Sequence, residues 1–227
     1  MIRYRHEYKY MLDARQRAIL QIRARAITQI DPHAGPDGTY IVRSVYFDDM
    51  NDSSLLDNLS GTDPRKKYRI RYYNSDTGRI VLEKKSKTRS CCLKESAILT
   101  PAECQVFLSG GIPGIRPDDP PIKKRLLYEM QCLGMTPKVI VTYVREPFVF
   151  PAGNVRITFD GSITSSNDVG GFLTGRYAQY PVLPEGQTVL EVKWDELMPR
   201  HIKDALLVNN LQWTAFSKYT LCRITHI

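Results

Sequence analysis

The sequence predicts one antiparallel α+β domain over residues 1–227, a sheet or barrel of roughly eight strands with a few peripheral helices. Its strand-like segments are short, rich in β-branched and aromatic residues, and mostly consecutive along the chain. No internal repeat, low-complexity tract or interior linker marks a domain boundary. The hydrophobic content of 42% is ordinary for a globular protein, so we expect the chain to form its own core.

Strands are predicted where β-branched and aromatic residues cluster between turn signals. They cover residues 3–10, 40–49, 67–73, 79–87, 92–99, 137–150, 154–160 and 188–194. The turn signal SDTG at 75–78 predicts a hairpin between the third and fourth of these strands. Residues 161–187, rich in Gly, Ser and Asn, are predicted to be a loop, and GGFLTG within it is interpreted as mobile rather than phosphate-binding.

Helices are predicted from their capping signals. Asp13 is an expected N-cap, before a helix whose inner face is predicted to hold Ile19, Ile22, Ala26 and Ile30. The segment TPAECQVFLSGG (100–111) has Thr at the cap, Pro at the first helical position and Glu three residues after the cap. Segment 120–135 repeats this organisation and ends at Gly134. A short helix or turn is predicted at 52–61, and a helix around 199–209.

The formal net charge of +8 favours an anionic partner: a nucleic acid, an acidic membrane or a phosphate-rich small molecule. No apolar run is long enough to span a bilayer, and the first residues, MIRYRHEYKY, lack the features of a signal peptide. We therefore expect a cytoplasmic protein. The five cysteines are interpreted as free thiols, and the four histidines lack the spacing of zinc ligands.

Charged and polar residues recur two apart along the predicted strands, which places them on one face of each strand. The pairs are Glu7 with Lys9, Arg69 with Arg71, Glu83 with Lys85, Tyr143 with Arg145, Arg156 with Thr158 and then Asp160, and Glu191 with Lys193. An open sheet with one solvated face gives the same alternation. However, strands 141–150 and 188–194 are too hydrophobic for that, so their charges are expected to be enclosed. Cations that line a narrow barrel would repel one another and lose hydration, so this arrangement is favourable only if a polyanion fills the barrel.

The carboxylates on the same faces have two interpretations. They are counter-ions of the cations, or they hold a hard divalent cation such as Mg²⁺ or Mn²⁺, which prefers oxygen ligands and is often shared with phosphates. For Glu191 metal binding is favoured. For Glu7, Glu83 and Asp160 a structural ion pair explains the pattern at least as well.

Seven segments, in order, carry a family resemblance: EYKY, RIRYY, LEKK, YVREPF, VRITFD, LEVKW and FSKY. Together they resemble the catalytic domain of the vacuolar transporter chaperone (VTC) polyphosphate polymerases, a branch of the triphosphate tunnel metalloenzymes. The resemblance runs through nearly the whole chain. It implies an antiparallel β-barrel tunnel lined with basic side chains, Mn²⁺ or Mg²⁺ as cofactor, and ATP and polyphosphate as ligands, with no nucleic acid expected.

Residue by residue, the resemblance and the alternation give an expected site. The substrate-binding residues are expected to be Lys9, Arg69, Arg71, Lys85, Lys94, Tyr143, Arg145, Arg156, Lys193 and Lys218. Those expected to be catalytic are Lys9, Arg69, Arg71, Lys85 and Glu191, with Glu191 also the metal ligand. Arg69 and Arg71 are expected to face the phosphates, while Tyr68, Ile70 and Tyr72 pack outward against helices.

Two positions depart from the wider family. Hydrolytic relatives begin with a Glu-x-Glu-x-Lys motif, but here Arg5 stands at the first glutamate, which favours the polymerase branch. Ala215 stands where a basic residue is expected three positions before Lys218. The fungal proteins also carry an SPX domain and membrane helices. The sequence shows neither, so it resembles a bacterial stand-alone form, and a separate membrane partner is an open expectation. The alternatives are a tunnel-type triphosphatase and a non-catalytic polyphosphate- or RNA-binding barrel.

Overall fold

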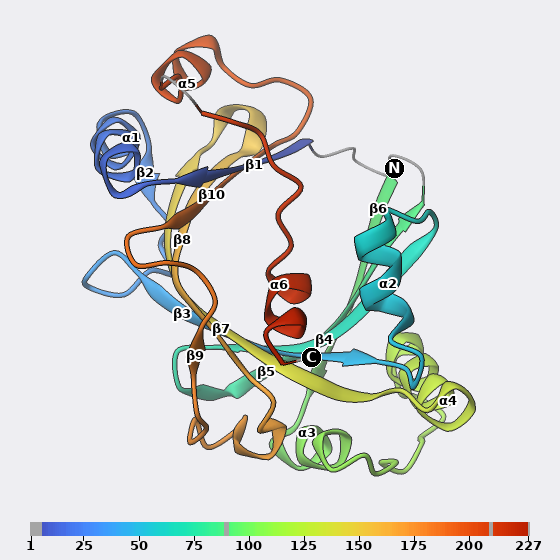
Figure 1. Ribbon diagram of the computed structural model, residues 1–227. Helices are drawn as coiled ribbons and strands as arrows, with labels where there is room; N and C mark the ends of the chain where they lie inside the picture. Colours follow the sequence, from blue (N-terminus) through green and yellow to red (C-terminus); the bar gives the residue numbers. More distant parts are fainter. Residues whose placement is uncertain (1–5, 89–90, 209–210, 227) are drawn as a thin grey trace. The chain divides into compact units, whose positions relative to one another are not determined.

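The computed structural model describes residues 6–88, 91–208 and 211–226, and it confirms the α+β class with antiparallel strand pairing (Figure 1). The contacts divide the chain into two compact units. Unit 1 comprises Met1–Ile41, Tyr143–Ile163 and Leu183–Ser217, and unit 2 comprises Val42–Thr142, Thr164–Val182 and Lys218–Ile227. Each unit has its own hydrophobic core. The expected single domain stays a prediction.

The strands form a 10-stranded sheet in which eight follow the order β1-β10-β8-β7-β3-β4-β5-β6 (Figure 1). Their bounds are β1 His6–Leu12, β3 Tyr40–Asp48, β4 Arg65–Tyr73, β5 Asp76–Thr88, β6 Cys91–Leu99, β7 Thr136–Phe150, β8 Val155–Ser166 and β10 Thr188–Trp194. The short strands β2 (Gln29–Ile30) and β9 (Tyr180–Pro181) pair with β7 and β8. Among the described strands the pairing is an open path, with β1 and β6 at its ends.

In unit 1, helix α1 (Ala14–Ile27) begins at Asp13, whose carboxylate accepts a hydrogen bond from the Gln16 backbone N–H at 2.7 Å. The predicted inner face of this helix is wrong: Leu20 and Ala24 are buried, whereas Ile22 is 71% exposed. Apolar residues lie on more than one side of the helix, and packing selects the side that carries Leu20. The core of unit 1 joins it to Phe148, Phe159, Leu190 and Ile202, the last from α5 (Arg200–Ala205).

In unit 2, the core is the expected outward face of β4: Tyr68, Ile70 and Tyr72 are fully buried. They cluster with residues of α3 (Pro101–Leu108) and α4 (Pro121–Leu133), including Phe107 and Leu126. The start of α3 and the end of α4 are as the sequence predicts. Thr100 and Glu103 form a capping box, and Gly134 ends α4 with a φ of 61°, a left-handed conformation that glycine adopts without strain.

Other predictions need adjustment. Strand β8 continues to Ser166 into the predicted loop, and the first predicted strand corresponds to β1, with residues 3–5 outside the described part of the chain. The predicted short helix is α2 (Ser53–Ser60), and the last segment forms α6 (Lys218–Ile224). Cys92, Cys104, Cys132 and Cys222 are free thiols. None of the described helices combines the length and the apolar character needed to cross a membrane.

Candidate functional site

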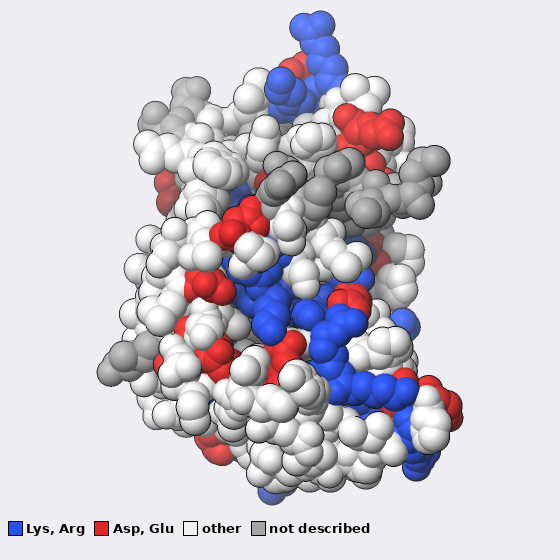
Figure 2. Space-filling view, turned by 90° about the vertical axis from the view of Figure 1, so that its right-hand side faces the viewer, with Lys and Arg blue, Asp and Glu red and all other residues white. Residues whose placement is uncertain are grey.

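Strands β4, β5 and β6 place basic side chains on one face of the sheet in unit 2. The register pairs Arg69 with Glu83, Lys67 with Lys85, and Lys85 with Lys94, so these residues project to the same side. We call this the unit 2 cationic face; its basic residues are Arg65, Lys67, Arg69, Arg71, Lys85, Lys87 and Lys94. Figure 2 shows basic side chains gathered in the middle of one side of the molecule, with single acidic side chains among them.

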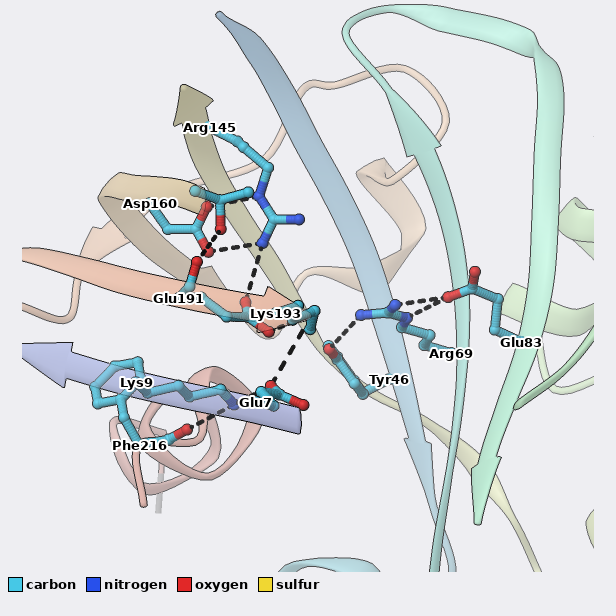
Figure 3. Close-up of polar contacts among 11 residues, drawn as sticks. Glu7, Lys9, Tyr46, Arg69, Glu83, Arg145, Asp160, Glu191, Lys193 and Phe216 are labelled. Atoms are coloured by element: carbon cyan, nitrogen blue, oxygen red, sulfur yellow. Dashed lines mark hydrogen bonds and ion pairs between the residues drawn. The ribbon is translucent and has the colours of Figure 1, made fainter. Parts of the chain in front are cut away.

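Glu83 lies at the centre of this face and is only 2% exposed. Arg69 Nε donates to its Oε2 at 2.7 Å (Figure 3), and Arg71 Nη2 and Lys94 Nζ approach its Oε1 at 2.6 and 2.5 Å. Burial alone would raise the pKa of Glu83, but attraction to Arg69, Arg71 and Lys94 lowers this pKa to about 2. One carboxylate therefore orders three cations, and positive charge remains in excess.

Strand β3 supplies the neighbouring side chains of the same face. Its register places Tyr46 opposite Arg69 and Ser44 opposite Arg71. The Tyr46 hydroxyl accepts a hydrogen bond from Arg69 Nη1 at 3.1 Å (Figure 3), and the Tyr46 ring lies 5.0 Å from that of Tyr219 in α6. Arg69 is thus held on two sides, by Glu83 and by Tyr46. The sequence prediction missed Tyr46, which the register of β3 against β4 would have revealed.

Unit 1 carries a second group of charges, on strands β1, β10, β8 and β7. The register pairs Lys9 with Glu191, and Lys193 with Glu7, which puts all four on one face. Arg145 on β7 binds Asp160 on β8 with both ends of its guanidinium, Nε to Oδ1 at 2.6 Å and Nη2 to Oδ2 at 2.7 Å (Figure 3). This pair is buried, and Arg145 Nη2 also lies 3.4 Å from Glu191.

The lysines of unit 1 are also engaged. Lys193 Nζ forms an ion pair with Glu191, and Lys9 Nζ lies 3.2 Å from Glu7 and donates to the Phe216 carbonyl at 3.1 Å (Figure 3). Burial lowers the pKa of Lys193, an effect that Glu191 and Glu7 only partly oppose. A lysine whose ammonium is destabilised in this way gains from an additional anion.

The remaining predicted residues are spread more widely. Arg156 pairs with the buried carboxylate of Asp31, and Lys218 is the first residue of α6. Lys85 lies on the unit 2 cationic face but is exposed. Tyr143 is buried beneath Arg145, whose guanidinium carbon lies 5.2 Å from the ring centre. The structure thus brings predicted residues together within each unit: Arg69, Arg71 and Lys94 in unit 2, and Lys9, Arg145, Lys193 and Glu191 in unit 1.

The carboxylates do not form a metal centre by themselves. Among the described residues no group of three or more His, Cys, Asp or Glu side chains could hold an ion. Glu83 and Asp160 are engaged by arginines, which favours the structural ion-pair interpretation for them. Both oxygens of Glu191 also contact cations, Lys193 and Arg145, so metal binding by Glu191 stays a prediction, in which phosphate oxygens supply the other ligands.

A sequence model of the VTC domain matches residues 4–225. The chain belongs to the VTC domain family. This confirms the family resemblance carried by the sequence segments. No curated protein matches the sequence.

Solved structures resemble this VTC domain at low sequence identity. HpAC1 from Hippeastrum, described as having a dominant triphosphatase activity, is 13% identical with a TM-score of 0.56, over 96% of this chain and 95% of that one. A candidate adenylate cyclase from Bacillus halodurans is 12% identical with a TM-score of 0.49, over 90% and 85% of the two chains. The match to the Hippeastrum protein shows that the VTC domain shares its fold.

Proposed function

We propose that this VTC domain is a metal-dependent phosphotransferase that moves the terminal phosphoryl group of ATP to a growing polyphosphate chain and releases ADP. The observation that carries the proposal is the convergence of Arg69, Arg71 and Lys94 on the single buried carboxylate of Glu83. Cations in such excess on an ordered sheet face suit a ligand of several linked phosphates.

The chain's residues would act by alignment and charge neutralisation. A terminal oxygen of the polyphosphate attacks the γ-phosphorus of ATP, a new P–O–P bond forms, and the bond to the leaving oxygen of ADP breaks. Arg69 and Arg71 would hold phosphate oxygens with their planar guanidinium groups, while Glu83 and Tyr46 fix the direction of Arg69. No residue needs to form a covalent intermediate.

Within unit 1, Lys9, Arg145 and Lys193 form a second cationic group, with Glu191 beside them, that would itself neutralise phosphate charge. Glu191 would help to hold Mn²⁺ or Mg²⁺, an ion that supplies Lewis-acid stabilisation of developing charge when bound. Asp160 holds Arg145 at both Nε and Nη2, so the guanidinium keeps one orientation when ligand binds.

A tunnel-type triphosphatase is the second candidate, because the Hippeastrum protein of the same fold is described as a triphosphatase. The same cations would bind the triphosphate, and water would replace polyphosphate as acceptor. Arg5, in place of the first glutamate of the hydrolytic motif, supports the polymerase over this candidate.

The test is to incubate purified protein with ATP and Mn²⁺ and to follow ADP, free phosphate and long polyphosphate. ADP with polymer is expected; free phosphate without polymer would support the triphosphatase, and binding without turnover a non-catalytic barrel. Glu191→Gln is expected to abolish metal-dependent turnover, whereas Glu196→Gln, an exposed carboxylate shortly after the same strand, is the matched control and is expected to retain it. Normal activity of the Glu191 variant would remove this residue from the site.

A further inference from the structure

Ser44 is a small polar residue at the floor of the unit 2 cationic face. It lies on β3, directly opposite Arg71 on β4, and shares its side of the strand with Tyr46, the hydrogen-bond partner of Arg69. Its side chain is almost completely enclosed, with 1% of the residue exposed. The register therefore directs a buried hydroxyl to the same side as Arg69 and Arg71.

The hydroxyl of Ser44 has no hydrogen-bond partner among the described residues. Most buried side-chain polar atoms in folded proteins do have a partner, and an unsatisfied one costs free energy. The residue is also an unusual choice for packing, because an alanine would fill nearly the same space without that cost. A buried, unsatisfied donor beside a cluster of cations indicates a position where an anionic oxygen binds.

The exposure of the surrounding cations gives the direction from which a ligand enters. The side chain of Lys94 is 54% exposed, that of Arg69 26% and that of Arg71 13%. All three contact Glu83, which leaves positive charge in excess around one carboxylate. The charge thus becomes less exposed from Lys94 toward Arg71, and Ser44 is opposite the most enclosed of the three.

We propose that Ser44 and Arg71 form the deepest phosphoryl subsite of unit 2, in which the Ser44 hydroxyl donates to a phosphoryl oxygen held by Arg71. Glu83 stays in place as the counter-ion that positions the guanidinium. The ligand is a linear chain of phosphoryl groups that enters past Lys94. This subsite deepens the proposed function and rests on it for the ligand class, although it does not depend on which acceptor receives the phosphoryl group.

The test combines two measurements on Ser44→Ala: thermal unfolding without ligand, and the affinity for inorganic tripolyphosphate by titration calorimetry. Because the hydroxyl has no partner within the described fold, the melting temperature is expected to stay the same or rise. Loss of a hydrogen bond to a charged oxygen is expected to weaken tripolyphosphate binding about tenfold. Ser86→Ala, on the opposite face of strand β5, which pairs with β4, is the matched control and is expected to change neither quantity.

Three results would overturn the subsite. They are wild-type affinity in Ser44→Ala, a lowered melting temperature that shows a partner for the hydroxyl within the fold, and absence of tripolyphosphate binding by the wild-type protein. The turnover assay separates this inference from the proposed function. If the wild-type protein releases only free phosphate while Ser44→Ala still loses affinity, the subsite stands and the polymerase proposal fails. If the wild-type protein makes polymer and Ser44→Ala binds like it, the subsite fails and the polymerase proposal stands.

Discussion

Arg145 and Asp160 form a buried, two-point ion pair, with both carboxylate oxygens within 2.7 Å of guanidinium nitrogens. The Asp160 side chain is completely enclosed and that of Arg145 nearly so. Removal of one partner from such a pair leaves an uncompensated charge in the interior. The free energy lost in this way is larger than the net stabilisation that the intact pair provides. The pair is therefore a structural requirement even where Arg145 also serves a ligand.

The first prediction concerns this pair. Asp160→Asn keeps the side-chain volume but removes the charge, and is expected to lower the free energy of unfolding by about 3 kcal/mol. Urea denaturation at neutral pH measures the change. The control is Asp204→Asn, which breaks an exposed pair with Arg200 and is expected to cost less than about 1 kcal/mol. Equal effects of the two substitutions would show that Arg145 does not depend on Asp160.

The second prediction concerns the pH dependence conferred by Glu83. Its pKa is about 2 in the folded protein, below the ordinary value of 4.5, so the ionised form stabilises the fold. This stabilisation is fully present above about pH 4.5 and is lost as the pH falls toward 2. Glu83→Gln is expected to lower the free energy of unfolding at pH 7 by about 3 kcal/mol and to flatten its decrease between pH 5 and 2.

The measurement is urea unfolding of the wild-type and Glu83→Gln proteins at a series of pH values. Without the carboxylate, Arg69, Arg71 and Lys94 repel one another, and an added anion should relieve that repulsion. Tripolyphosphate is therefore expected to raise the melting temperature of the variant more than that of the wild-type protein. An unchanged pH profile in the variant would contradict the role of Glu83.

The third prediction concerns Asp48, which caps α2 from outside the helix. Its Oδ1 accepts from the Ser54 backbone N–H at 2.8 Å, and its Oδ2 from that of Leu55 at 3.0 Å and from the Tyr219 hydroxyl at 2.5 Å. Asp52, at the N-cap position, makes no side-chain cap bond. One buried carboxylate thus holds both the start of α2 and helix α6.

Asp48→Ala is expected to cost about 3 kcal/mol, because it removes a cap and leaves buried donors unsatisfied. Tyr219→Phe removes only the hydroxyl contact and is expected to cost about 1 kcal/mol. Thermal and urea unfolding of both variants give the comparison. If Tyr219→Phe costs as much as Asp48→Ala, the cap contributes nothing, and the contact to α6 accounts for the whole effect.

Local rules explain which parts of this structure the sequence predicts. The sequence predicts Asp13 and Thr100 as caps, and both form capping boxes, because a cap depends on a residue only three positions away. The alternation on β4 was predicted because every strand has the same two-residue period. The buried face of α1 was not, since apolar residues lie on several sides of this helix and only its packing distinguishes Leu20 from Ile19.

The residues that the sequence did not reveal depend on contacts between distant segments. The roles of Ser44 and Tyr46 depend on the register of β3 against β4. The role of Asp48 depends on its contacts with α2 and α6. The sequence pattern allows two interpretations of Glu83, and its contacts with Arg69, Arg71 and Lys94 favour the counter-ion role. The two-residue period predicts the face of the strand on which a residue lies. Only the strand pairing shows which residues are its neighbours on that face.

The last prediction uses two adjacent residues of β4 that face opposite sides. The Tyr68 hydroxyl donates to Glu129 Oε1 of α4 at 2.9 Å within the unit 2 core, and Arg69 contacts Glu83 on the cationic face. Tyr68→Phe is expected to lower the free energy of unfolding by about 1–2 kcal/mol and to leave tripolyphosphate affinity unchanged. Arg69→Gln is expected to weaken that affinity about tenfold or more, because it removes a charged donor from the phosphate face.

Calorimetric titration and urea unfolding on both variants give four values whose pattern is decisive. The two substitutions lie one position apart, so a general disturbance of β4 would affect both quantities in both variants. Opposite patterns would show that the alternation separates a packing face from a binding face, because side chains one residue apart in a strand point to opposite sides. Unchanged tripolyphosphate binding in Arg69→Gln would place the ligand elsewhere than on the unit 2 cationic face.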